Sequence, residues 1–115
     1  MYKVEGTTIT MTRGDTALIR VGMTRDGTEY TPQAGDSVRF AAKTELNRTG
    51  TEFKEAEPLI VKQIPIDTMI LRLDPEDTKG LPFGYYTYDI EITFASGIVD
   101  TFIPNSRLVL APEVH

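Results

Sequence analysis

The densest group of acidic side chains is Asp74, Glu76 and Asp77. Carboxylate oxygens are the ligands that Ca²⁺ prefers, but the segment lacks the alternating oxygen ligands and the glycine of an EF-hand loop. The same residues have the pattern of a helix start, with Asp74 as N-cap, Pro75 at the first helical position and acids in the first turn. We therefore predict one capped helical turn, ended by Gly80, and no metal site.

A second acidic group, Asp89, Glu91 and Asp100, falls on the outer face of a hairpin predicted over residues 85–103. A glycosidase needs two carboxylates at a set separation, one of them with a pKa raised by burial. Outward positions on polar strands do not supply that burial. The sequence therefore favours a solvated face over a catalytic pair.

Other chemistry is limited by the residue types that are missing. The 115 residues include no Cys and a single His, His115, so thiolate catalysis, disulfides and an internal catalytic His are excluded. The net charge of −5 and the dispersed basic residues disfavour nucleic-acid binding. No apolar run approaches the roughly 20 residues that span a membrane, and the N-terminal residues do not begin a signal peptide. We expect no catalytic residues, no cofactor and no membrane contact.

Two short motifs have simpler explanations than the functions they suggest. Arg13-Gly14-Asp15 is an integrin-type tripeptide, but Gly-Asp between two strands is also what a tight turn requires. Asn47-Arg48-Thr49 is a formal glycosylation sequon, which has no use without a signal peptide.

The elements that must position these side chains are short strands. Isoleucine, valine and threonine make 33 of the 115 residues, and apolar residues alternate in short runs between turn signals. The pattern predicts a single domain over residues 1–115: an antiparallel β-sandwich of about seven to eight strands with one short helical turn. Residues 44–58 lack the pattern and are predicted to form a long surface loop. The predicted strands are Thr7–Met11, Thr16–Met23, Ser37–Lys43, Leu59–Ile64, Met69–Leu73, Tyr85–Phe94 and Arg107–Leu110.

Two hairpins follow from turn residues. Asp26-Gly27 predicts a two-residue loop that pairs Arg25 with Thr28. At Ser96-Gly97, a three-residue loop would place Asp100 opposite Ile92 in the core, at a high desolvation cost. We therefore predict a two-residue loop, with Phe94 paired to Val99, Ile92 to Thr101 and Ile90 to Ile103.

This register also predicts an interaction surface. It places Phe102 opposite Glu91 on the outer face, which Tyr85 shares. Aromatics surrounded by Asp89, Glu91 and Asp100 have the composition of an apolar anchor within a polar rim. Scattered exposed aromatics are also normal on protein surfaces, so both interpretations stand at this point.

The acidic turn followed by Gly84-Tyr85-Tyr86-Thr87-Tyr88 resembles the corner of immunoglobulin-type sandwiches, which reads Gly-x-Tyr-x-Cys. The resemblance implies that Tyr86 is a corner tyrosine, with its hydroxyl bonded to the preceding turn. Tyr88 stands at the position of the disulfide Cys. Only the sandwich architecture therefore carries over, and not an antibody-type domain.

The chain as a whole resembles small immunoglobulin-like β-sandwich proteins from the tail and baseplate gene regions of phages and prophages of Gram-positive bacteria. The likeness rests on turn and strand signatures, not on functional residues: residues 12–16, 30–32, 35–40, 84–90 and 97–101. It implies a non-enzymatic structural or adaptor protein of the virion, assembled in the bacterial cytoplasm. Its partners would be other phage structural proteins or further copies of itself in a homo-oligomer.

The alternative function is a carbohydrate-binding β-sandwich. Trp, the usual best platform for a sugar ring, is absent, so Tyr85 and Phe102 would have to serve. An enzyme of another type is disfavoured by the missing Cys and internal His.

Overall fold

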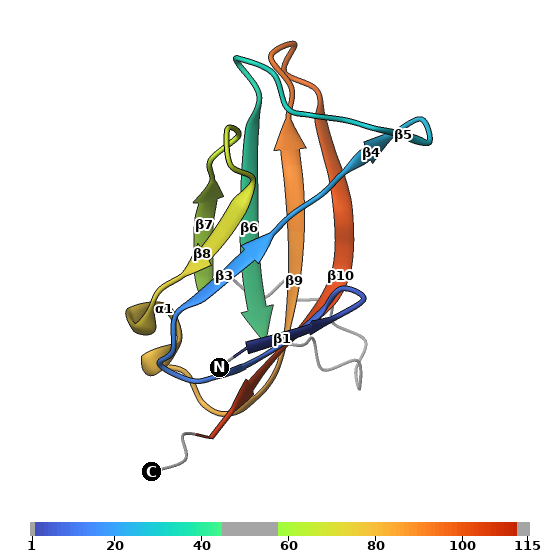
Figure 1. The fold of residues 1–115 in the computed structure, drawn as a ribbon. Helices are drawn as coiled ribbons and strands as arrows, with labels where there is room; N and C mark the ends of the chain where they lie inside the picture. Colours follow the sequence, from blue (N-terminus) through green and yellow to red (C-terminus); the bar gives the residue numbers. More distant parts are fainter. Residues whose placement is uncertain (1, 45–57, 113–115) are drawn as a thin grey trace, which may run out of the picture.

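The computed structural model describes residues 2–44 and 58–112, and these form ten strands and one short helix (Figure 1). The prediction of an all-β fold is confirmed. The elements in chain order are β1 (Tyr2–Glu5), β2 (Thr8–Thr12), β3 (Ala17–Arg20), β4 (Thr24–Arg25), β5 (Thr28–Glu29), β6 (Ser37–Thr44), β7 (Ile60–Ile64), β8 (Ile70–Leu73), α1 (Pro75–Lys79), β9 (Gly84–Thr93) and β10 (Val99–Ala111).

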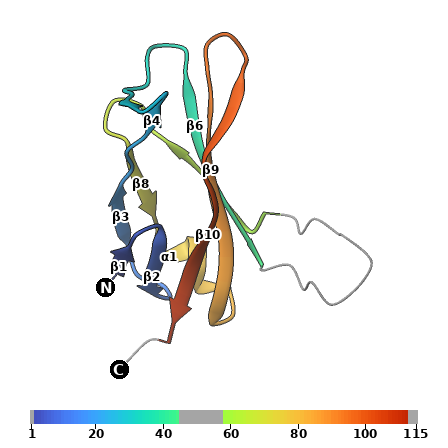
Figure 2. The ribbon, with the colours of Figure 1, turned by 90° about the vertical axis from the view of Figure 1, so that its right-hand side faces the viewer.

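The strands form two layers. Six of them make a sheet in the order β1-β2-β10-β9-β6-β7, and β3 and β8 form a two-stranded sheet that lies against one face of it (Figures 1 and 2). A small β4–β5 hairpin projects beside them. The large sheet is mixed and not purely antiparallel as predicted, because β10 runs parallel to β2.

The core lies between the two layers, where the period of two along each strand turns one set of side chains inward. From the large sheet it takes the inward residues of β9 and β6, among them Phe40, whose ring centroid lies 5.1 Å from that of Tyr88. From the small sheet it takes Ile19, Leu71 and Leu73, all of them buried. The outer face of the large sheet has no second layer within the part of the chain that the structure describes (Figure 2).

Several local predictions are confirmed. The helical turn follows Asp74, and the Asp26-Gly27 loop joins β4 to β5 with Arg25 opposite Thr28. Asp26 and Gly27 have φ values of 54° and 77°, as a tight hairpin turn with the twist of its strands requires. The predicted loop over residues 44–58 is only partly testable, since residues 45–57 lie outside the described residues, as does the Asn47 sequon.

Other elements differ from the prediction. The predicted strand Thr16–Met23 is shortened to β3 (Ala17–Arg20), and residues 21–23 lie between β3 and β4. Met69 lies outside β8 with a left-handed φ of 53°. The first strand, β1, was not predicted. All four of its residues are exposed, so it has no buried face to produce an alternating pattern.

The β9–β10 hairpin has a different register from the one predicted. Its loop has three residues, because the Phe94 amide donates to the carbonyl of Ile98 at 2.8 Å. Asp100 therefore lies opposite Ile92, the arrangement rejected on desolvation grounds. The desolvation cost does not arise, since this end of the strand is not covered and Asp100 is exposed.

A bulge between Thr101 and Ile103 then restores the predicted pairing of Ile103 with Ile90. Thr101, and not Phe102, lies opposite Glu91. Phe102 is half-buried and packs against the core. Its predicted place on the outer face is therefore wrong.

We predict that Phe102→Ala lowers the free energy of unfolding by about 1–3 kcal/mol, less than for a fully buried Phe because the ring is only half-buried. Urea unfolding of the purified domain measures this. Tyr85→Ala is the control: its side chain is 59% exposed, so we expect a loss below about 1 kcal/mol. Equal stability of Phe102→Ala and the wild type would contradict the observed register.

Candidate interaction surface

The structure brings together only part of the predicted interface. Tyr85, Asp89 and Glu91 alternate along the outer face of β9. Asp100 and Phe102 belong to the other side of the sheet, since Asp100 is paired with the inward Ile92 and Phe102 packs on the core. The five residues therefore do not form one surface.

The upper part of this outer face is polar. Arg39 of β6 lies opposite Glu91, and the two form an ion pair of 3.1 Å. A depression of about 200 Å³ lies beside them over Ala41, which is shorter than its charged neighbours Lys43 and Asp89. Small-molecule sites usually enclose about 300–1,000 Å³ and are mostly apolar. This depression is too small and too polar for such a site.

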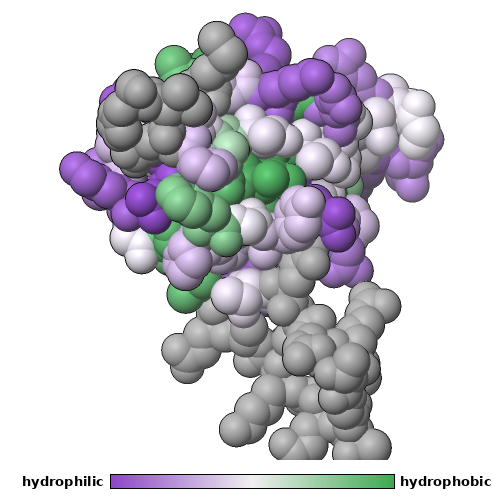
Figure 3. All heavy atoms as spheres, turned by 90° about the horizontal axis from the view of Figure 1, so that it is seen from below, coloured by the Kyte–Doolittle hydropathy of each residue, from purple (hydrophilic) through white to green (hydrophobic). Residues whose placement is uncertain are grey.

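Two exposed aromatic rings near the start of β9 are each stacked with an arginine. The Arg107 guanidinium lies 4.7 Å from the ring centroid of Tyr85, and that of Arg13 lies 4.2 Å from the centroid of Phe83. Phe83 is 48% exposed and Tyr85 is 59% exposed. We call Arg13, Phe83, Tyr85 and Arg107 the Arg–aromatic patch. The end of the domain seen from below shows hydrophobic side chains at its centre, bordered by hydrophilic ones (Figure 3).

Sequence reasoning found Tyr85 in this patch but missed its other members. Phe83 and Tyr85 flank Gly84, the first residue of β9. The two arginines come from distant segments, and only the fold brings them to the rings. Their types match those enriched in interface hot spots, where Tyr and Arg predominate.

The Arg13-Gly14-Asp15 segment lies in the turn between β2 and β3 and contacts the helix region. Arg13 Nη1 donates to the carbonyl of Leu81 at 3.2 Å, and the Gly14 amide donates to Oγ1 of the buried Thr78 at 2.8 Å. These hydrogen bonds give the segment a structural role. An integrin-type role would require an exposed arginine, and this one is engaged.

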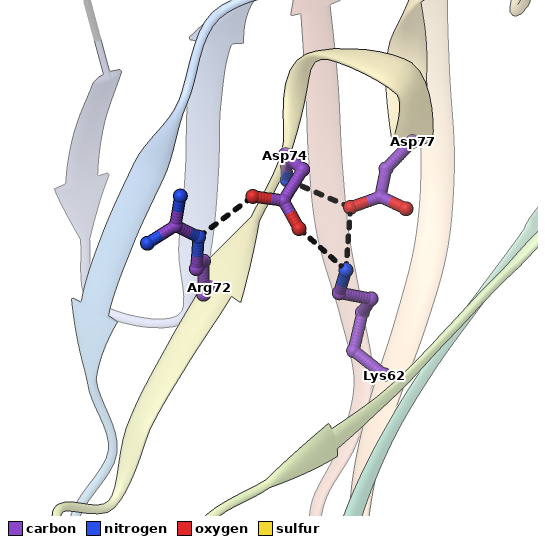
Figure 4. A network of polar contacts seen from close by, with 4 residues as sticks. All are labelled: Lys62, Arg72, Asp74 and Asp77. Carbon is purple, nitrogen blue, oxygen red and sulfur yellow. Dashed lines mark hydrogen bonds and ion pairs between the residues drawn. The ribbon is translucent and has the colours of Figure 1, made fainter.

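The acidic cluster of the helix start is part of an ion network (Figure 4). Lys62 Nζ lies 3.0 Å from Asp74 Oδ2 and 2.9 Å from Asp77 Oδ2, while Arg72 Nε lies 2.7 Å from Asp74 Oδ1. The Asp74 amide also donates to Asp77 Oδ2 at 2.7 Å, as in a capping box. Within residues 2–44 and 58–112, no group of three or more acidic or imidazole side chains is placed to hold a metal ion.

The network shifts the pKa of its members in the directions that favour their charges. The hydrogen bond from Arg72, and then that from Lys62, lowers the pKa of Asp74. The hydrogen bond to Asp77, supported by Asp74, raises the pKa of Lys62 against the opposing effect of burial. Both shifts stabilise the ionised network and do not prepare either group for proton transfer.

The predicted corner tyrosine is confirmed in its hydrogen bond. The buried Tyr86 donates its hydroxyl to the carbonyl of Pro82 at 2.6 Å, in the turn that precedes β9. Burial raises the pKa of this phenol. Two positions on, Tyr88 donates to the carbonyl of Thr7 at 2.5 Å. The residue in the place of the disulfide Cys therefore ties β9 to the loop between β1 and β2.

Comparison of the chain with protein-family models, with curated proteins and with solved structures finds no match. Among the described residues, no helix has the length and apolar character to cross a membrane.

We predict that Tyr86→Phe lowers the free energy of unfolding by about 1–3 kcal/mol, because the buried carbonyl of Pro82 loses its donor. Thermal and urea unfolding measure the change. Tyr85→Phe, which removes an exposed hydroxyl from the neighbouring residue, should have little effect. Equal small effects of the two substitutions would show that the Tyr86 hydroxyl does not contribute to the corner.

We predict a pH-dependent effect of Asp74→Asn. Because the folded-state pKa of Asp74 is lowered, its ion pairs stabilise the domain above the unfolded pKa of about 4 and lose this effect as pH falls through the folded pKa. The variant should therefore be less stable than the wild type at neutral pH, and the difference should shrink in acid. Urea unfolding at neutral pH and in acid tests this prediction. Asp89→Asn, on the outer face of β9, is the control. A difference independent of pH would contradict the role of the charge.

Proposed function

We propose that this chain is a non-enzymatic structural or adaptor module that acts through protein contacts, as a tail or baseplate component of a phage or prophage. The observation that carries the proposal is the Arg–aromatic patch. It is an exposed surface of the type that proteins use for contact, with two large rings about half-exposed and two guanidinium groups beside them.

We also propose that the fold is an immunoglobulin-like sandwich. Support comes from the pair β3–β8 facing the strands β10, β9 and β6 of the large sheet, and from the hydrogen bond of Tyr86 at the start of β9. The resemblance of the sequence to phage tail sandwiches depends on these same turns and strands.

Catalysis has little support in the described residues. The carboxyl groups with shifted pKa values are Asp36 and Asp74, and both pKa values are lowered by hydrogen bonds within the fold. A general acid would need a raised pKa in a concave site. Asp36 instead joins loops: it accepts from the Gln33 and Ala95 amides and from the Tyr30 hydroxyl.

The carbohydrate-binding alternative has less support than protein contact. It needs Tyr85 and Phe102 on one platform, and they lie on opposite sides of the sheet. Tyr85 also has Arg107 stacked on its ring, at 4.7 Å from the centroid, which reduces the surface that a sugar could cover.

The test is to induce phage production in the strain that encodes the chain, purify the particles and quantify their proteins by mass spectrometry. The proposal expects the chain in the particles at a constant ratio to the tail proteins. Its absence from particles that contain the other tail proteins would refute the proposal. Specific binding of the purified domain to cell-wall polysaccharides on a glycan array would favour the alternative.

A further inference from the structure

A groove runs between the two layers on the side of the domain that faces the viewer in Figure 2, with β3 and β4 on one side of it and β10 on the other. Its lower part is a crevice of about 250 Å³, and its upper part is an open depression of about 390 Å³. The two parts meet at Gly22, which lines both. We call this feature the side groove.

The lining of the side groove is mostly apolar. The crevice reaches buried residues of the core: Ile9, Ile19, Leu71, Tyr88 and Ile90. In the upper depression the half-buried Phe102 lies on the lining. Two of the described lining residues are charged, Arg20 in the crevice and Glu29 in the upper depression, and both are exposed. Neither takes part in an ion pair with another described residue.

The edge of β3 that faces the crevice has unpaired backbone groups. Within the part of the chain that the structure describes, β3 pairs with β8 alone. The Val21 amide donates to the Met69 carbonyl at 2.8 Å, so alternate residues of β3 direct their backbone groups toward β8. Arg20 has the opposite orientation, and its N–H and C=O point to the free edge. The Leu18 carbonyl on this edge accepts the Tyr2 hydroxyl, which shows that the edge faces β1.

The opposite wall of the side groove is less suited to strand pairing. Because β2 pairs with β10 only over Leu108–Ala111, the upper part of β10 has no strand on this side among the described residues. Its register is interrupted twice, between Thr101 and Ile103 and between Ile103 and Ser106. Such bulges protect an edge from added strands. A strand that entered the groove would therefore pair with β3.

We propose that the side groove binds an extended segment of another protein, which adds a strand to β3. The backbone of this segment bonds to the amide and carbonyl of Arg20, and its alternate aliphatic side chains enter the crevice. Charge complementarity gives it an acidic side chain at the end near Arg20 and a basic one at the end near Glu29. This contact is separate from the Arg–aromatic patch and does not depend on a place in a phage tail.

The probe is a random heptapeptide library displayed on yeast and selected against the full chain. We expect selected sequences in which aliphatic and polar residues alternate, with an acidic residue toward one end and a basic one toward the other. When the most enriched peptide is bound, hydrogen exchange at the Arg20 amide should slow, because strand pairing protects that group. Enrichment of no peptide, or exchange at Arg20 that a bound peptide leaves unchanged, would overturn the proposal.

Gly22→Leu is the variant that fills the side groove. A Cβ at Gly22 meets no atom within 4 Å, and the residue does not have a left-handed φ, so the domain can accept a side chain there. We expect wild-type stability and a loss of affinity for the selected peptide of about tenfold or more, because the new side chain occupies its space. The matched control is Gly80→Leu, at an exposed glycine after α1 that also has open space, and it should bind as the wild type does. Full affinity in Gly22→Leu would contradict the assignment to the groove.

Two substitutions of Arg20 separate the backbone contact from the charge. Arg20→Pro removes the amide at the free edge, where proline is tolerated, and should abolish binding. Arg20→Ala keeps that amide and should only reduce the preference for an acidic residue. Equal binding by Arg20→Pro and Arg20→Ala would overturn strand addition.

Sedimentation velocity of the chain alone tests the other occupant, a second copy. Self-association that Gly22→Leu abolishes would place a second copy in the groove and overturn the proposal of a different protein. The proposed function fails separately, because the presence of the chain in purified particles does not depend on peptide binding.

Discussion

The structure depends on the burial of one face of β9. Tyr86, Tyr88, Ile90 and Ile92 point into the core from the centre of the large sheet. Two of them are tyrosines, and a buried hydroxyl without a partner is costly, so the two rings require nearby carbonyl groups. The carbonyls of Pro82 and Thr7 supply them, and the loops that contain these residues are tied to the strand. The same alternation that buries Tyr86 turns Tyr85 to the outer face, where it forms part of the Arg–aromatic patch.

The ion network has a different role, because it connects the edge strand β7 of the large sheet to β8 and α1. Lys62 lies on the inward side of the edge strand β7, opposite Phe40, and its ammonium reaches α1 in the chain that follows β8. A half-buried cation at this point needs carboxylate partners, and the helix start provides two. The acids that suggested a metal site therefore connect β7 to the first turn of the helix. Arg72 extends the network along β8.

Much of the fold could be predicted because its signals are local. The helix start at Asp74 and the Asp26-Gly27 hairpin each depend on residues that are only a few positions apart in the sequence. The β9–β10 register could not be predicted in this way. The prediction of a two-residue loop assumed that a residue opposite Ile92 must be buried. Asp100 lies opposite Ile92 but is exposed, because the second layer does not extend over this end of the strand. The inward position of Phe102 follows from this register, because residue 102 shares the face of Asp100 opposite Ile92. The bulge that then pairs Ile103 with Ile90 has no clear signal in the sequence. Likewise, no local pattern predicts that Arg13 reaches Phe83.

The Arg–aromatic stacks reduce the apolar area that the rings of Phe83 and Tyr85 expose. An exposed aromatic patch promotes non-specific association, but a guanidinium stacked on each ring covers part of the apolar area and adds charge. The charge also favours hydration of this surface. The negative net charge of the chain acts in the same direction, because it opposes contact between copies in most orientations.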